Sequence, residues 1–142
     1  MTFIDTNVFV YLIDGRDPFK QSRARSIISD AFGSEKYMIS SQVLNEFANV
    51  ALKKLGVPIE NVRQYVKSFS RICIVDQKYS WTDCALQIKA QYGLQFYDSL
   101  LLATAEANGC DEFITEDLND GQLYCGIKAV NPFVDAPQPH FV

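Results

Sequence analysis

The first seven residues, MTFIDTN, constrain the fold of this chain more than any other stretch. Phe3 and Ile4 are apolar, strand-forming residues. A strand that buries them must end at Asp5, because burying an ionised carboxylate without a partner is costly. In an open parallel sheet, ligands bind at the carboxyl ends of the strands, where each following helix begins. Asp5 is therefore predicted to end the first strand at a binding edge.

Apolar patterning predicts that strands and helices alternate along the rest of the chain. Further strands are expected over residues 37–39, 71–75, 111–115 and 127–130. Helices are expected over 7–13, 17–32, 42–55, from 58 onward, 80–92 and 98–109. Asp17 and Asp98 stand where N-cap residues belong, and Ser80 to Asp83 resembles a capping box. This alternation predicts an α/β fold, a three-layer α/β/α sandwich with a mainly parallel central sheet.

The length of 142 residues fits one domain, and no run of about 18 apolar residues could span a membrane. Because the chain opens on a strand, no signal peptide is expected. The four cysteines show no CxxC pair and no zinc-like spacing. They are predicted to be reduced core thiols of a cytoplasmic protein; they are Cys73, Cys84, Cys110 and Cys125.

The net charge of −4 is unusual for a protein that handles nucleic acid, because contacts to phosphates need lysine and arginine. The distribution of charge matters more than the sum. If four of the 17 acids occupy one metal site, the other 13 balance the 13 bases. A nucleic-acid substrate is therefore compatible with this composition.

Three further acids are predicted to lie at the same edge as Asp5. Glu46 is near the start of the helix expected over 42–55 and leans toward its N-terminus. Asp98 stands at a helix start, and Asp117 follows the strand expected over 111–115. Two of them have an ordinary alternative explanation, a surface ion pair for Glu46 and a helix cap for Asp98.

Four carboxylates without counter-charge would repel one another and take up protons. Hard oxygen ligands favour Mg²⁺ or Mn²⁺ over zinc. Such a site suits hydrolysis of a phosphodiester, in which metal ions activate water and stabilise the attacking and leaving oxygens. Motifs for other chemistries are absent, including GxxxxGK[ST], GxSxG and GxGxxG after a strand. The single histidine, His140, is ascribed to the C-terminal tail.

Four segments, FIDTN, SSQVLNEF, FYDSLLLATA and ITEDLNDGQ, resemble the PIN domain, and closely the VapC toxins of type II toxin–antitoxin pairs. The resemblance covers roughly residues 1–133 as one nuclease domain and leaves 134–142 as a flexible tail. It implies Mg²⁺-dependent cleavage of RNA, with Mn²⁺ as a possible substitute. It also implies a homodimer and inhibition by a cognate antitoxin protein. No membrane partner is expected, because the chain has no long apolar run.

Carried over onto this sequence, the resemblance implies that Asp5, Glu46, Asp98 and Asp117 are the catalytic and metal-binding acids. Asn7 and Thr115 match the polar residues that support them. The fourth acid has two competitors beside it, Glu116 and Asp120.

Two other function classes stay open at this stage. A phosphohydrolase of related fold would use a DxD pair, but Asp5-Thr6-Asn7 has an amide in place of the second acid. A non-catalytic PIN-like binding module would keep the fold with gaps among the four acids, and the sequence shows none.

Overall fold

The structure, a computed structural model, describes residues 1–134 and contains a six-stranded sheet. The strands are β1 (Thr2–Ile4), β2 (Tyr37–Ser40), β3 (Cys73–Val75), β4 (Glu112–Ile114), β5 (Leu123–Tyr124) and β6 (Ile127–Val130). Their spatial order is β3-β2-β1-β4-β6-β5, and every neighbouring pair is parallel except β5 with β6. The mainly parallel sheet confirms the prediction. β5 was not predicted, because two residues are too short to show an alternating pattern.

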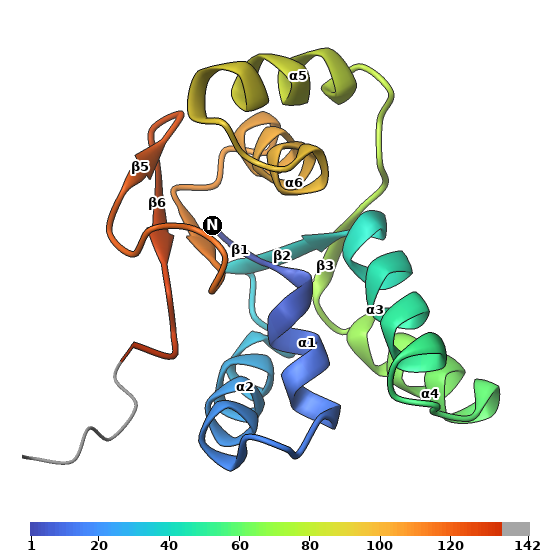
Figure 1. Cartoon of the computed structure of the whole chain (residues 1–142). Coiled ribbons are helices and arrows are strands. Elements are labelled where there is room, and N and C mark those ends of the chain that lie inside the picture. The colour runs from blue at the N-terminus through green and yellow to red at the C-terminus, as the bar shows by residue number, and fades with distance from the viewer. Residues whose placement is uncertain (135–142) are drawn as a thin grey trace, which may run out of the picture.

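Helices cover both faces of the sheet (Figure 1). They are α1 (Thr6–Ile13), α2 (Pro18–Ala31), α3 (Ser41–Lys53), α4 (Ile59–Phe69), α5 (Trp81–Tyr92) and α6 (Phe96–Ala107). The connections from β1 to β2 and from β2 to β3 place α1 to α4 on one face, whereas α5 and α6 cover the other (Figure 1). The chain therefore changes direction between the adjacent strands β1 and β4. Such a switch point opens a crevice at the carboxyl ends of the strands.

Aromatic packing fixes α1, α3 and α4 beneath the sheet. The ring of Phe69 on α4 lies 4.8 Å from that of Phe9 on α1 and 5.0 Å from that of Phe47 on α3, both edge to face. All three side chains are fully buried. On the sheet itself, Phe3 stacks on Phe113 with centroids 5.4 Å apart, which aligns β1 with β4. The packing holds the ends of β1 and β4 beside the first turn of α1.

Of three predicted helix starts, that at Asp17 is confirmed with its cap, that at Ser80 is confirmed in position but lacks the predicted capping bond, and that at Asp98 is wrong. The Asp17 side chain accepts a hydrogen bond from the Lys20 backbone N–H, as an N-cap should. In contrast, α6 begins at Phe96, so Asp98 lies within its first turn and is not the cap. Ser80 has helical backbone angles, φ −62° and ψ −20°, and makes no capping bond. Because the turn has already started there, its hydroxyl cannot reach the free N–H groups of α5.

The four cysteines are free thiols, but only Cys110 is buried. Cys84 and Cys125 are partly exposed, and Cys73 is exposed on β3, which lies at an edge of the sheet. Cys84 and Cys125 still pack against the core, so the prediction of core thiols is wrong for Cys73 alone. Within residues 1–134, the helices are too short or too polar to cross a membrane. His140 and residues 135–142 of the predicted tail lie outside the described residues.

Candidate active site

Asp5 marks the carboxyl end of β1 and also caps α1. Its Oδ1 accepts a hydrogen bond of 2.6 Å from the Thr6 backbone N–H, and its Oδ2 accepts one of 2.7 Å from the Thr115 hydroxyl. The residue is only 4% exposed. The predicted strand end is thus a buried carboxylate, oriented by donors from the two strand ends that flank the switch point.

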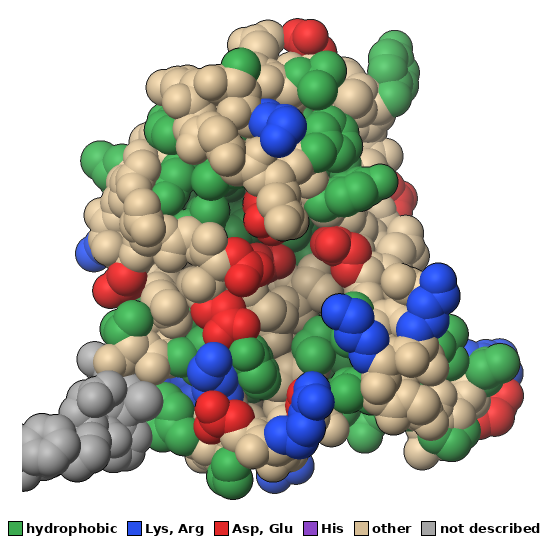
Figure 2. Space-filling model, in the orientation of Figure 1, with side chains coloured by type: hydrophobic (Ala, Val, Ile, Leu, Met, Phe, Trp, Pro, Cys, Tyr) green, Lys and Arg blue, Asp and Glu red, His purple; other side chains and the backbone are tan. Residues whose placement is uncertain are grey.

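Two other predicted acids meet Asp5 at this edge. Asp98 lies in the first turn of α6, and Asp117 follows β4. One carboxylate oxygen from each of Asp5, Asp98 and Asp117 lies within 4.8 Å of the other two. Figure 2 shows acidic side chains gathered near the middle of the face, between the upper and lower helical layers. Three acids that are distant in sequence therefore form one group of carboxylates, which we call the acid triad.

Asn7 and Thr115 contact the acid triad directly, as expected of supporting residues. The Asn7 amide donates to Asp117 Oδ2 over 3.0 Å. The Thr115 hydroxyl donates to Asp5 and accepts from the Asp117 backbone N–H over 3.0 Å. The two side chains connect Asp5 to Asp117 and restrain both carboxylates.

Glu46 lies in the wall of the same cleft but is not part of the acid triad. Its Oε1 accepts hydrogen bonds of 3.1 Å from the Thr6 hydroxyl and from the Gln42 amide. The structure therefore brings three of the four predicted acids together and holds the fourth beside them. The contacts of Thr6 and Gln42 were not predicted, although Gln42 precedes Glu46 by one helical turn and so shares its face.

The two competitors for the fourth position are engaged elsewhere. Glu116 accepts 2.6 Å and 2.9 Å bonds from the Tyr11 hydroxyl and the Lys20 ammonium. Asp120 accepts a bond of 2.9 Å from the Asn131 backbone N–H. Asp117 is consequently the acid of this segment that faces Asp5 and Asp98. Tyr11 and Lys20 were not predicted to take part, because nothing local to α1 or α2 indicates a contact with residue 116.

Burial and mutual repulsion raise two pKa values in the acid triad. Burial raises the pKa of Asp5 from 3.8 to about 7, with the Asp98 and Asp117 charges adding to the shift and the bond from Thr115 opposing it. Burial raises the pKa of Asp98 from 3.8 to about 6, and the charges of Asp117 and Glu46 add to this shift. The free site therefore holds protons near neutral pH, as expected where a cation is needed to balance the charge.

The acid triad lies in a cleft of about 420 Å³ that also carries basic and apolar side chains. Arg16 and Lys54 line it, and Arg16 forms an ion pair of 2.7 Å with Asp14. Carboxylate oxygens are the ligands that Mg²⁺ and Mn²⁺ prefer. Cationic side chains beside such ligands suit a phosphate chain.

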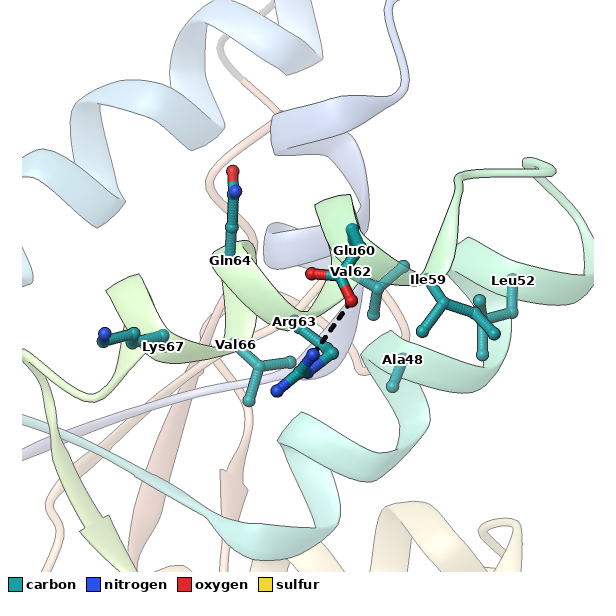
Figure 3. Close-up of a pocket in the computed structure, with 9 residues that line it drawn as sticks. All are labelled: Ala48, Leu52, Ile59, Glu60, Val62, Arg63, Gln64, Val66 and Lys67. Carbon is teal, nitrogen blue, oxygen red and sulfur yellow. Dashed lines mark hydrogen bonds and ion pairs between the residues drawn. The ribbon is translucent and has the colours of Figure 1, made fainter.

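A groove of about 680 Å³ lies between α3 and α4 (Figure 3). Its lining includes the exposed apolar side chains Leu52 and Ile59, which are 42% and 66% exposed. An ion pair of 2.9 Å between Glu60 and Arg63 lies along α4 (Figure 3). Because α3 contributes Glu46 and Val50 to the cleft and Leu52 to the groove, one helix separates the two surfaces.

Comparisons with known proteins agree with this architecture. The solved structures that are similar include a toxin–antitoxin complex from Klebsiella pneumoniae, at 21% identity and a TM-score of 0.70, covering 93% of this chain and 98% of that chain. They also include DNA-bound VapBC from Salmonella typhimurium, at 23% identity, a TM-score of 0.63, and coverage of 90% and 95%. VapC20 from Mycobacterium tuberculosis, described as a toxin that cleaves the sarcin–ricin loop, matches at 16% identity, a TM-score of 0.62, and coverage of 80% and 87%.

These identities are low, and the likenesses establish the fold alone. A search of curated protein sequences found no match. The family model of the PIN domain matches residues 2–119, a span that includes Asp5, Glu46, Asp98 and Asp117. This chain belongs to the PIN domain family.

Proposed function

We propose that this protein is a Mg²⁺-dependent endoribonuclease and the toxin of a toxin–antitoxin pair. The observation that carries the proposal is the acid triad, three carboxylates from β1, α6 and the segment after β4 within 4.8 Å of one another. Membership of the PIN family supports the same chemistry. Similar solved structures include toxin–antitoxin complexes, and another is of a toxin described as cleaving the sarcin–ricin loop.

Asp5, Asp98 and Asp117 would hold Mg²⁺ or Mn²⁺. When bound, such an ion lowers the pKa of water and offsets the charge of a reacting phosphate. Asn7 and Thr115 keep Asp5 and Asp117 in place for this task.

Glu46 serves as a proton acceptor at the cleft wall in this proposal. The Thr6 and Gln42 bonds go to its Oε1, which leaves Oε2 to accept a proton from the attacking water. Arg16 and Lys54, which line the cleft, would contact phosphates next to the reacting one. Glu46 thus acts beside the acid triad, as a catalytic residue that supplements the ligands.

The two alternative functions have less support. A phosphohydrolase would need an acid at position 7, and the Asn7 amide instead donates to Asp117. A non-catalytic binding module would not require three carboxylates to converge in a cleft that raises two of their pKa values.

Cleavage should depend on the metal ion. We expect single-stranded RNA to be cut internally in Mg²⁺ or Mn²⁺ and to remain intact in EDTA. Ca²⁺ should bind and support little cleavage, because its looser coordination fits in-line displacement poorly. Mapping of the cut ends by gel or sequencing checks this. Undiminished cleavage in excess EDTA would disprove the metal mechanism.

The antitoxin should block both the cleft and the groove. We expect it to place an arginine or lysine against the acid triad, because a bidentate arginine complements paired carboxylates. An apolar segment of the same antitoxin would cover Leu52 and Ile59 across α3. Asp98→Asn and Leu52→Gln should each weaken binding of the protein encoded beside this gene by about tenfold or more, measured by calorimetry.

The matched control for Leu52 is Leu86→Gln on α5, since Leu86 is 51% exposed and does not line the groove. It should leave the affinity unchanged. If the neighbouring protein bound the Asp98 and Leu52 variants as tightly as the parent, this mode of inhibition would be wrong. Homodimer formation stays a prediction of the family resemblance and is checked by sedimentation.

A further inference from the structure

A second cavity, of about 480 Å³, adjoins the acid cleft and has a different lining. Four carboxamides surround it together with one aromatic and one aliphatic side chain: Gln42, Asn45, Asn49, Gln77, Tyr97 and Leu100. They come from α3, from the segment after β3 and from α6. Glu46 lines both this cavity and the cleft, so the two sites share one wall. We call this second site the amide pocket.

Buried amide atoms in the amide pocket lack hydrogen-bond partners among the described residues. Gln42 is 8% exposed, and its Nε2 donates to Glu46 Oε1 over 3.1 Å and to the Tyr97 carbonyl over 3.2 Å. These bonds fix the orientation of the amide, yet its Oε1 has no partner. Both polar atoms of the Gln77 side chain are also buried without one. Buried polar groups are normally satisfied, so these side chains would gain hydrogen bonds by turning their covered polar atoms toward a ligand in the pocket.

Tyr97 and Leu100 give the amide pocket a surface for a flat ring. Tyr97 is 61% exposed, which is high for an aromatic residue at the start of a central helix. Its ring packs edge to face against Phe96, with centroids 5.3 Å apart. Leu100 is almost fully buried and adds apolar surface. An exposed ring of this kind is a stacking platform for an unpaired base.

The polarity of the lining selects a neutral ligand. Apart from Glu46, no lining residue of the amide pocket carries a charge, so the site suits a phosphate poorly. A carboxamide offers one donor group and one acceptor, and that pairing complements the edge of a nucleobase. The acid cleft, in contrast, contains Arg16 and Lys54, which suit the backbone of the same strand.

We propose that the amide pocket binds one unpaired base of the RNA next to the phosphate that is cut, and so sets the sequence preference of cleavage. Tyr97 stacks on the base, and Gln42 and Gln77 read its edge. This inference rests on the proposed ribonuclease function. Its first test is therefore a binding measurement that needs no cleavage.

The first test titrates the protein with the four ribonucleosides in EDTA, followed by NMR. Nucleosides carry no phosphate, so the acid cleft neither attracts nor repels them. One nucleoside should shift the side-chain amide signals of Gln42 and Gln77 and bind at least severalfold more tightly than the weakest of the four. Gln77→Leu and Tyr97→Ala should each remove that discrimination. If no nucleoside shifts these signals, the amide pocket is not a base site.

The second test uses cleavage of a randomised single-stranded RNA library with sequencing of the products. The parent should favour one base beside the cut by about tenfold or more, and both variants should reduce that preference. The matched controls are Gln91→Leu and Tyr79→Ala, exposed residues of the same types that do not line the amide pocket. Both controls should keep the parental preference.

The outcomes separate the two proposals. Nucleoside discrimination without any RNA cleavage would overturn the ribonuclease proposal and keep the base site. Cleavage with a preference that neither variant changes would overturn the base site alone. The variants could instead change the oligomeric state, measured by sedimentation, and keep the base preference. That result would identify the amide pocket as a protein contact and overturn the base-site proposal. Unchanged Mn²⁺ affinity in both variants shows that the neighbouring acid triad is still folded.

Discussion

Replacing Asp98 by asparagine is expected to lower RNA cleavage by more than about 100-fold at pH 7. Loss of groups that merely support metal ligands already costs about 10- to 100-fold, and Asp98 is itself one of the three converging carboxylates. Asparagine keeps the shape of the side chain but removes the charge. Because Asp98 makes no capping bond in α6, the substitution should not disturb the helix.

Initial rates on the preferred RNA and Mn²⁺ affinity by calorimetry check this expectation together. The matched control is Asp30→Asn, on the exposed side of α2, which should cleave and bind Mn²⁺ like the parent. Cleavage by Asp98→Asn within a few fold of the parent would show that the acid triad does not carry the reaction. A loss of cleavage with unchanged Mn²⁺ affinity would assign Asp98 to a step other than metal binding.

Replacing Asp5 by asparagine is expected to raise the melting temperature in EDTA at pH 7 and to lower it relative to the parent in Mg²⁺. The folded pKa of Asp5 is about 7, above its ordinary value of 3.8, so the native state binds more protons than the unfolded state between these pH values. Stability of the parent therefore falls as pH rises from about 4 to about 7. Each pKa unit of relief corresponds to about 1.4 kcal/mol, or a few degrees in Tm for a domain of this size.

An asparagine at position 5 should fold, because its side-chain oxygen can still accept the bond from the Thr6 N–H. The stability of the variant should fall less than that of the parent as pH rises. The fall that remains is due to Asp98, whose pKa is about 6. Millimolar Mg²⁺ binds the native parent and stabilises it by mass action, whereas the variant has lost one ligand. Thermal melts across pH 4 to 8, with and without Mg²⁺, measure both effects. If Asp5→Asn and the control Asp30→Asn behaved alike in every buffer, the carboxylates would not share a site.

Local sequence determined the backbone of this protein. The apolar run before Asp5 specified a strand that ends just before that residue, and Asp17 before Pro18 specified a helix start. Gly93 ends α5 with a φ of +69°, a left-handed conformation that glycine adopts without strain. These features depend on neighbours within one or two turns, so they can be predicted from short patterns. The same patterns placed the start of α6 wrongly. Aspartate is a preferred N-cap residue, so the pattern favours Asp98 as the cap, whereas α6 begins two residues earlier at Phe96.

The members of the site were decided only by the tertiary structure. Glu46, Glu116 and Asp117 are all acids near the ends of elements, and no local pattern ranks them. Glu116 is withdrawn from the acid triad by Lys20, 96 residues earlier, and Glu46 is held by Thr6, 40 residues earlier. Thr6 and Glu46, for example, meet only after Phe9, Phe47 and Phe69 pack α1, α3 and α4 together. The sequence by itself thus determined where carboxylates could emerge, whereas long-range packing and hydrogen bonding decided which of them face one another.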